Sequence, residues 1–333
     1  VLVHRAELLR QWQERLTAFL DLPSGVPGLI GGGRERLSGV VDIAVMQSLI
    51  RRDDLPELLG RYGQIIVDEC HHISAFSFES VLKMATASYV MGLTATPERR
   101  DGHHPIIFMQ CGPIRHKSAR PPAAPSELEV RPRFLAAPKM PPESRIQDVF
   151  RTLAEDASRN GRILCDIQDL YQAGRKILVL TERTEHLDVL SRAVEERIAP
   201  PFVLRGRQSS KQRKAVMDSL ELLDDLAPRI LMSTGRLIGE GFDHAPLDTL
   251  VLAMPISWKG TLQQYVGRLH RVHQGKQDVR VYDYVEVDHP QLARMWAKRR
   301  AGYRAMGYLE RDDGAPINGC LDFEQPDEAD GDQ

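Results

Sequence analysis

The stretch Ile65-Ile66-Val67-Asp68-Glu69-Cys70-His71-His72 places two carboxylates directly after a short apolar run. Such a run is typical of a buried parallel β-strand, and ligands of open α/β sheets bind beyond the carboxyl ends of the strands. We therefore expect Asp68 and Glu69 to face a phosphate-binding cleft. A plain strand end followed by a polar turn would show the same local pattern.

The composition is typical of a globular protein with about two domains. The 333 residues are 42% hydrophobic and 27% charged, and a chain of this length usually folds into two domains with separate cores. No apolar run approaches the roughly 20 residues that a membrane-spanning helix needs, so the sequence predicts a cytoplasmic protein without a membrane partner. The net charge of −2 does not itself indicate nucleic-acid binding, for which a locally basic groove would suffice.

Apolar runs and helical patterns alternate twice along the chain, which predicts an α/β fold with two parallel-sheet units. In the first unit, residues 1–118, we expect strands at 43–45, 65–67 and 89–93 and helices at 7–19 and 78–87. In the second unit, residues 144–310, we expect a helical region at 144–171, strands at 176–180, 229–232, 249–253 and 279–282, and a helix at 290–303. Seven prolines between positions 121 and 142 predict an extended linker over residues 119–143, and the acidic residues 311–333 predict a disordered tail.

Further segments stand on both sides of the carboxylate pair: VLVHRAELL (1–9), DIAVMQSL (42–49), GLTATP (92–97), ILVLTERT (177–184), STGR and GEGFD (233–236 and 239–243), and QYVGRLHR (264–271). In this order they resemble motifs Ia, Ib, III, IV, V and VI of superfamily 2 helicases, and VDECHH (67–72) resembles motif II. The chain is most similar to the DEAD/DEAH-like branch that includes type III restriction subunits and XPB-like repair translocases. The resemblance covers residues 1 to about 284 and implies two RecA-like domains, each a mostly parallel sheet flanked by helices.

The resemblance also implies roles in ATP hydrolysis. Asp68 would hold Mg²⁺, and Glu69 would orient or deprotonate the water that attacks the γ-phosphate. Arg271, with Arg268 beside it, would reach the γ-phosphate from the second unit as an arginine finger, which is worth about 10³ to 10⁵ in rate. Two arginines at positions i and i+3 of a helix are, taken alone, more often solvated.

Other residues are expected to contact the nucleotide or to report closure of the two units around it. In the family, Gln264 and His71 are spaced to meet across the cleft. The remaining nucleotide contacts implied by the resemblance are Gly239, Gly241 and Asp243.

A nucleic-acid strand would be held through its phosphates, by groups that do not read bases. Thr94 and Thr96 could link hydrolysis to that strand, because a hydroxyl can bridge a carboxylate and a neighbouring strand; a Thr-Ala-Thr-Pro turn is the alternative. The other expected contacts are Arg5, Gln47, Ser48, Thr181, Arg183, Thr234 and Gly235. The resemblance favours DNA over RNA, whereas the residues themselves do not decide between them.

One motif is missing. The sequence contains no G-x-x-x-x-G-K-[ST] loop, whose amides and lysine grip nucleotide phosphates, and Gly31-Gly32-Gly33-Arg34 is expected to form a flexible turn. In the family the loop precedes motif Ia, so we expect the P-loop strand and helix of the first domain upstream of Val1. The expected function is the core of an ATP-dependent DNA helicase or translocase, with a nuclease or primase module possible elsewhere in the protein. A helicase-like scaffold that binds nucleic acid without hydrolysing ATP is the alternative.

Overall fold

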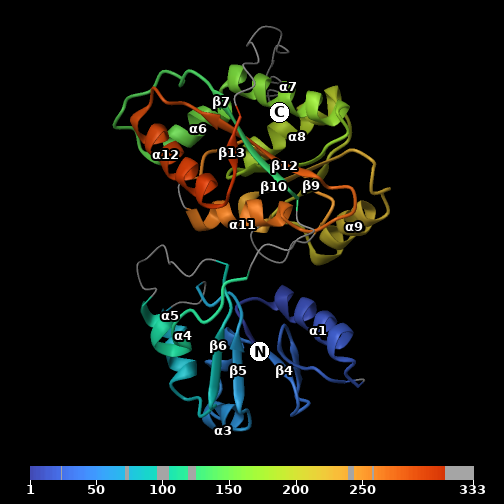
Figure 1. Cartoon of the computed structure of the whole chain (residues 1–333), viewed down its shortest axis with the longest axis vertical. Coiled ribbons are helices and arrows are strands. Elements are labelled where there is room, and N and C mark those ends of the chain that lie inside the picture. Colours follow the sequence, from blue (N-terminus) through green and yellow to red (C-terminus); the bar gives the residue numbers. More distant parts are fainter. Residues whose placement is uncertain are drawn as a thin grey trace, which may run out of the picture. The chain divides into compact units, whose positions relative to one another are not determined.

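Two mostly parallel sheets organise the chain, one in each of two units, Val1–Ala119 and Arg120–Gln333 (Figure 1). The computed structural model describes residues 1–23, 25–71, 75–95, 105–118, 125–238, 244–256 and 259–311. Among these residues, no helix is both long and apolar enough to cross a membrane.

The sheet of the first unit has the strand order β3-β2-β4-β1-β5-β6. Its strands are β1 (Leu2–Val3), β2 (Gly28–Gly31), β3 (Arg34–Arg36), β4 (Asp42–Val45), β5 (Gln64–Val67) and β6 (Tyr89–Gly92). Neighbouring strands are parallel, except in the antiparallel hairpin of β2 and β3. The helices are α1 (Ala6–Leu20), α2 (Met46–Leu49), α3 (Leu55–Gly60), α4 (Ala75–Leu82) and α5 (Pro105–Cys111). Helix α1 lies beside β4, and α5 lies beside β6 (Figure 1).

The glycine cluster of the first unit forms the predicted turn. Gly32 and Gly33 have φ angles of 62° and 78°, and they connect β2 to β3 with Gly31 paired to Arg34. Two consecutive positive φ angles are typical of tight hairpin turns, and glycine adopts them without a steric penalty. The cluster therefore closes a hairpin, whose two strands the sequence analysis did not predict.

The sheet of the second unit has the order β13-β7-β12-β11-β8-β10-β9, and all neighbouring strands are parallel. Its strands are β7 (Glu127–Phe134), β8 (Lys176–Thr181), β9 (Phe202–Leu204), β10 (Arg229–Thr234), β11 (Thr249–Leu252), β12 (Asp278–Val285) and β13 (Leu309–Glu310). Its helices are α6 (Ile146–Glu155), α7 (Ala157–Gln172), α8 (Thr184–Arg197), α9 (Ser210–Glu221), α10 (Gly235–Ile238), α11 (Lys259–Leu269) and α12 (Pro290–Ala305).

Helices cover both faces of the second sheet. Leu178 and Leu180 of β8 belong to one core cluster, and Ile177 and Val179 belong to another. Successive side chains of a strand point to opposite faces, so the two clusters lie on opposite faces of the sheet. Burying one such side chain stabilises a fold by about 1.5–3 kcal/mol, which explains why the central strands are continuous apolar runs.

The prediction of a linker over residues 119–143 is wrong for Glu127–Phe134, because these residues form β7 within the second sheet. The prolines indicated an extended chain, and a β-strand is also extended. Pro132 is tolerated because β13 pairs only with Glu129 and Val130, which leaves the proline near the sheet edge, where one missing N–H costs little.

Two other predictions differ from the structure or lie outside it. The helix expected at 78–87 is α4, which covers Ala75–Leu82 and is followed by a turn. Residues 312–333 of the expected disordered tail lie outside the described residues.

Candidate functional site

Parallel pairing brings the ends of four strands of the first unit to one edge of the sheet. Leu2 pairs with both Ala44 and Val67, and Val67 pairs with Gly92. Residues that follow these strands therefore emerge at the same edge, beyond the carboxyl ends of the strands. They include the predicted site residues Arg5, Gln47, Ser48, Asp68, Glu69 and Thr94.

Asp68 is held from both the sheet and α1. Its backbone N–H donates to the carbonyl of Leu2 at 2.9 Å, and its Oδ1 accepts from the Glu69 backbone N–H at 2.9 Å. Its Oδ2 accepts from Nε1 of Trp12, on α1, at 2.7 Å. Trp12 is not among the site residues predicted from the sequence. The apolar residues Leu8, Trp12 and Leu16 of α1 indicate a face that packs on the sheet, but this spacing does not reveal a carboxylate partner.

The carboxylate of Asp68 fits the expected role in holding Mg²⁺. Each carboxylate oxygen can accept about two hydrogen bonds, so Oδ1 and Oδ2 each retain a lone pair for a cation or its water. Mg²⁺ in phosphoryl-transfer sites usually has one or two carboxylate ligands together with phosphate and water oxygens. Asp68 is half-buried, which leaves it accessible from the sheet edge.

Glu69, His71 and Thr94 form one cluster. Glu69 has a φ of 46°, in the left-handed region that non-glycine residues seldom adopt and that recurs at functional sites. Its Oε2 lies 3.3 Å from Nδ1 of His71, and the same nitrogen lies 2.6 Å from Oγ1 of Thr94. The His71 side chain is 1% exposed and that of Glu69 is 26% exposed. The cluster therefore holds the Glu69 carboxylate beside a buried imidazole and leaves its side chain partly exposed.

Strand pairing explains why Thr94 reaches His71. The Leu93 N–H donates to the carbonyl of Val67 at 2.8 Å, and the Cys70 N–H donates to the carbonyl of Leu93 at 3.1 Å. The ladder of β5 and β6 thus continues past both strands. It keeps the segment after β6 beside the segment after β5.

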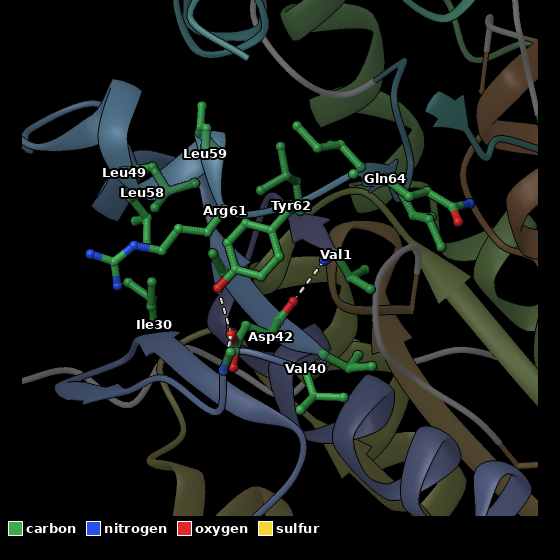
Figure 2. A pocket seen from close by; sticks show the side chains of 17 residues that line it. Val1, Ile30, Val40, Asp42, Leu49, Leu58, Leu59, Arg61, Tyr62 and Gln64 are labelled. Atoms are coloured by element: carbon green, nitrogen blue, oxygen red, sulfur yellow. Dashed lines mark hydrogen bonds between the residues drawn. The ribbon is translucent and has the colours of Figure 1, made fainter. Parts of the chain in front are cut away.

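A cavity of about 280 Å³ lies at the other edge of the same sheet (Figure 2). Among the residues that line it, Val1 donates its amino N–H to the Asp42 carbonyl at 2.7 Å, and the Tyr62 hydroxyl donates to Oδ2 of Asp42 at 2.5 Å. Asp42 and Gln64 begin β4 and β5, so this cavity lies at the amino ends of the strands. Ligands of such sheets bind at the carboxyl ends, and we do not place the nucleotide in this cavity.

In the second unit, β8 and β10 end side by side, with Thr181 paired to Thr234. Arg183 is half-buried, directly before α8, and Gly235 begins α10. Thr181 is 2% exposed, and its hydroxyl lies 2.9 Å from Nδ1 of His186. Its side chain is therefore turned into the protein, and only its backbone could take part in the predicted nucleic-acid contact.

His186 is enclosed within this unit. Its Nε2 lies 2.9 Å from Oδ1 of Asn160, and burial lowers the pKa of the imidazole to about 3. The network of Thr181, His186 and Asn160 fixes the end of β8 against α7 and α8.

The predicted arginine finger lies at the carboxyl end of α11. Gln264 and Arg268 are half-buried on this helix, whereas Arg271 lies two residues beyond its end at Leu269 and is also half-buried. The interpretation of Arg268 and Arg271 as one face of a helix is therefore wrong, because the helix ends between them.

Lys276, which the sequence analysis missed, holds the segment that carries Arg271. Its Nζ donates to the carbonyls of Leu269 and Arg271, each at 3.0 Å, and burial lowers its pKa to about 8. A cation at this position complements the negative end of the helix dipole. Four predicted site residues, Thr96, Gly239, Gly241 and Asp243, lie outside the described residues.

Comparisons with known proteins identify the family. Residues 1–99 match the family "Type III restriction enzyme, res subunit", and residues 160–273 match the "Helicase conserved C-terminal domain". These ranges contain the carboxylate cluster and the arginine pair. The chain belongs to the superfamily 2 helicases, in the branch of type III restriction subunits and XPB-like proteins.

This chain matches only part of the length of each relative described below. A protein named as helicase D10 of Escherichia phage T5 is 25% identical over 85% of this chain and 61% of that protein. The DNA 3'-5' translocase XPB2 of Sulfurisphaera tokodaii is 34% identical over 36% of this chain and 26% of that protein. The chain thus spans less than two thirds of these relatives.

Solved structures confirm the predicted fold class of two RecA-like domains. S. cerevisiae Dbp5 bound to RNA and ADP BeF3 has a TM-score of 0.59 at 11% identity, covering 94% of this chain and 77% of that chain. A fragment described as an HsdR subunit of a type I restriction enzyme from Vibrio vulnificus YJ016 has a TM-score of 0.56 at 21% identity. It covers 85% of this chain and 52% of that chain.

Proposed function

We propose that this chain forms the motor core of an ATP-dependent DNA helicase or translocase, which couples ATP hydrolysis to movement along nucleic acid. The observation that carries the proposal is the cluster of Glu69, His71 and Thr94 beside Asp68, at the carboxyl ends of β5 and β6. A strand end followed by an ordinary polar turn does not require a strained carboxylate residue held by a buried histidine.

Phosphoryl transfer depends on positioning and on neutralising charge more than on covalent chemistry. Mg²⁺, when bound, would neutralise the phosphate oxygens, and Asp68 would hold it. Glu69 would orient the attacking water and accept its proton. His71 and Thr94 would keep the Glu69 carboxylate pointed at that water.

The second unit would supply the positive charge. We assign Arg271 as the arginine finger and Arg268 as its neighbour on the γ-phosphate, and we assign Gln264 to meet His71 when the units close on ATP. Closure on ATP and reopening after hydrolysis would move the grip along the nucleic-acid strand. Arg183, Thr234 and Gly235, at the strand ends of this unit, are the proposed phosphate contacts.

The proposal requires a phosphate-binding loop, and no G-x-x-x-x-G-K-[ST] pattern occurs in these 333 residues. The loop supplies most of the grip on the nucleotide phosphates, so we expect this chain alone to bind ATP poorly and to hydrolyse little. We propose that residues outside this sequence, encoded upstream of it, supply the loop.

DNA is favoured as the partner because the XPB2 relative is named as a DNA translocase. The likeness to Dbp5 bound to RNA concerns the fold alone, at 11% identity. Nucleic-acid contacts through phosphates predict tolerance of sequence and a steep dependence on salt.

The test is the ATPase activity of a polypeptide extended upstream in the encoding DNA, measured with single-stranded DNA, duplex DNA and RNA. We expect stimulation by DNA and a loss of about 10²- to 10⁴-fold in Glu69→Gln. The 333-residue chain is the matched control and should show little turnover. Nucleic-acid binding without turnover in the extended polypeptide would instead support the scaffold.

A further inference from the structure

A hydrogen bond joins α11 to the end of β8. Tyr265 follows Gln264 on α11 and is 3% exposed. Its hydroxyl donates to Oε1 of Glu182, the residue directly after β8, at 3.2 Å. Glu182 is exposed, so this hydrogen bond reaches from the surface of the unit to the interior. Burial raises the pKa of the Tyr265 hydroxyl, which therefore remains a donor at neutral pH.

The backbone of Gly235 completes this contact. A Cβ at position 235 would clash with the hydroxyl oxygen of Tyr265, and it would lie 2.6 Å from Cζ of the same ring and 2.7 Å from Oε1 of Glu182. Only glycine allows the backbone to approach so closely. The start of α10, directly after β10, thus packs against the Tyr265–Glu182 pair.

Glu182, Gly235 and Tyr265 connect the residues proposed to contact nucleic acid with the residues proposed to contact the γ-phosphate. Glu182 precedes Arg183 and Gly235 follows Thr234, at the strand ends assigned to nucleic acid. Tyr265 precedes Arg268 by three residues on α11, so it lies about one helical turn from Arg268. Neither Glu182 nor Tyr265 is among the site residues predicted from the sequence.

The other contacts of α11 with its own unit include apolar packing. Leu262, Val266 and Leu269 are each 0% exposed and belong to the core cluster of this face. Apolar packing is non-directional, whereas a hydrogen bond depends on the positions of both partners. The bond from Tyr265 to Glu182 therefore adds a directional constraint on the position of α11 relative to β8.

We propose that Tyr265 and Glu182 are positioning residues, which fix α11 and its Arg268 relative to the strand ends assigned to nucleic acid. This inference rests on the proposed function for its consequence in catalysis. A shift of the β8 or β10 end on binding a strand would be transmitted through Glu182 and Gly235 to Tyr265, and from there to Arg268.

The first test concerns the position of α11 and requires no ATPase activity. In Tyr265→Phe the ring remains and the hydroxyl is lost. We expect the amides of residues 259–269 to exchange hydrogen about fivefold faster, as expected for the net loss of one hydrogen bond. Tyr284→Phe is the matched control, because the Tyr284 hydroxyl is also buried but donates to Asp166, at 2.9 Å. Equal exchange of these amides in wild type and Tyr265→Phe would overturn the proposal.

The second test uses the extended polypeptide with saturating DNA. We expect Tyr265→Phe and Glu182→Ala to lower the DNA-stimulated kcat about tenfold while the KM for ATP stays close to wild type. Glu182→Gln retains an acceptor oxygen and should recover most of the rate. Equal kcat values in Tyr265→Phe and Tyr284→Phe would contradict the positioning role. An inactive wild-type extended polypeptide would contradict the proposed function, and the exchange measurement would still decide the position of α11.

Discussion

The two units hold their candidate residues in different ways. In the first unit, Glu69 and Thr94 each contact the same nitrogen of His71. In the second unit, Arg268 and Arg271 lie on and beyond one helix, which Tyr265 and Lys276 tie to other segments. The difference indicates that the carboxylate site depends on local strand pairing, whereas the arginine site depends on how a helix packs.

The central strands are buried in both sheets, β4 in the first unit and β8 from Ile177 onward in the second. A sheet covered on both faces holds its helices in well-defined positions. The second unit is thus suited to present an arginine from a helix end.

Replacing the proposed finger should have the largest effect. Arg271→Ala in the extended polypeptide should lower DNA-stimulated kcat by about 10³- to 10⁵-fold, because Arg271 is the arginine finger assigned to neutralise charge on the γ-phosphate in the transition state. Arg294→Ala is the control, since Arg294 is an exposed arginine of the same unit. Unchanged turnover in Arg271→Ala would show that the finger is assigned to the wrong residue.

The free energy of unfolding shows how much the second unit depends on its buried polar contacts. Asp283 is 0% exposed and accepts two hydrogen bonds from Arg299, at 2.8 and 2.9 Å. Asp283→Ala would leave a buried guanidinium without its carboxylate, and we expect the free energy of unfolding to fall by about 3–5 kcal/mol. The measurement is urea unfolding of the whole chain, followed by tryptophan fluorescence.

The matched control for Asp283→Ala is Glu310→Ala. Glu310 pairs with Arg300 at 2.7 Å, and the Arg300 side chain is 44% exposed. A surface pair of this kind contributes at most about 1 kcal/mol. If both variants lost the same free energy of unfolding, the buried pair would contribute no more than the surface pair, and the prediction would be wrong.

The enclosed imidazole of His186 predicts that the second unit is less stable in acid. Its pKa is lowered from an ordinary 6.5 to about 3, so below pH 6.5 the unfolded chain binds a proton that the folded unit excludes. The free energy of unfolding should therefore fall as the pH decreases below 6.5, by about 2 kcal/mol at pH 5 from this group. Urea unfolding at pH 7.5 and pH 5 checks the slope, and His186→Gln should reduce it.

Among these variants, the smallest effect is expected when one hydroxyl is removed from the carboxylate cluster. Thr94→Val removes the hydroxyl that lies 2.6 Å from His71 and keeps the shape of the side chain. One hydrogen bond contributes about 0.5–1.5 kcal/mol, so we expect DNA-stimulated kcat to fall by up to about tenfold. Thr86→Val, at an exposed position of the same unit, should not change the rate. A loss as large as that of Glu69→Gln would mean that Thr94 contacts the reacting groups itself.

Much of the fold could be predicted because buried parallel strands are local apolar runs. Gln64–Val67 and Lys176–Thr181 lie within one residue of their predicted bounds at each end. Glu127–Phe134 was missed because its proline indicated a linker, and Phe202–Leu204 was missed because so short a run carries little pattern.

Some features of the candidate site could also be predicted from the sequence, and others could not. Asp68, Glu69 and Thr94 lie at one sheet edge because each lies within two residues of the end of a strand. Two contacts between distant residues could not be predicted. Trp12 lies 56 residues from Asp68, and Tyr265 lies 83 residues from Glu182. No local pattern encodes which carboxylate such a side chain meets.

The sequence by itself determined the two parallel-sheet units, the superfamily resemblance and the strand ends that carry the candidate residues. These depend on apolar periodicity and on motif order, both of which are properties of short segments. Only the tertiary structure decided that Trp12 binds Asp68, that His71 joins Glu69 to Thr94, and that α11 is tied to β8. The reason is physical: such contacts depend on strand register and helix packing, which form only when distant segments come together.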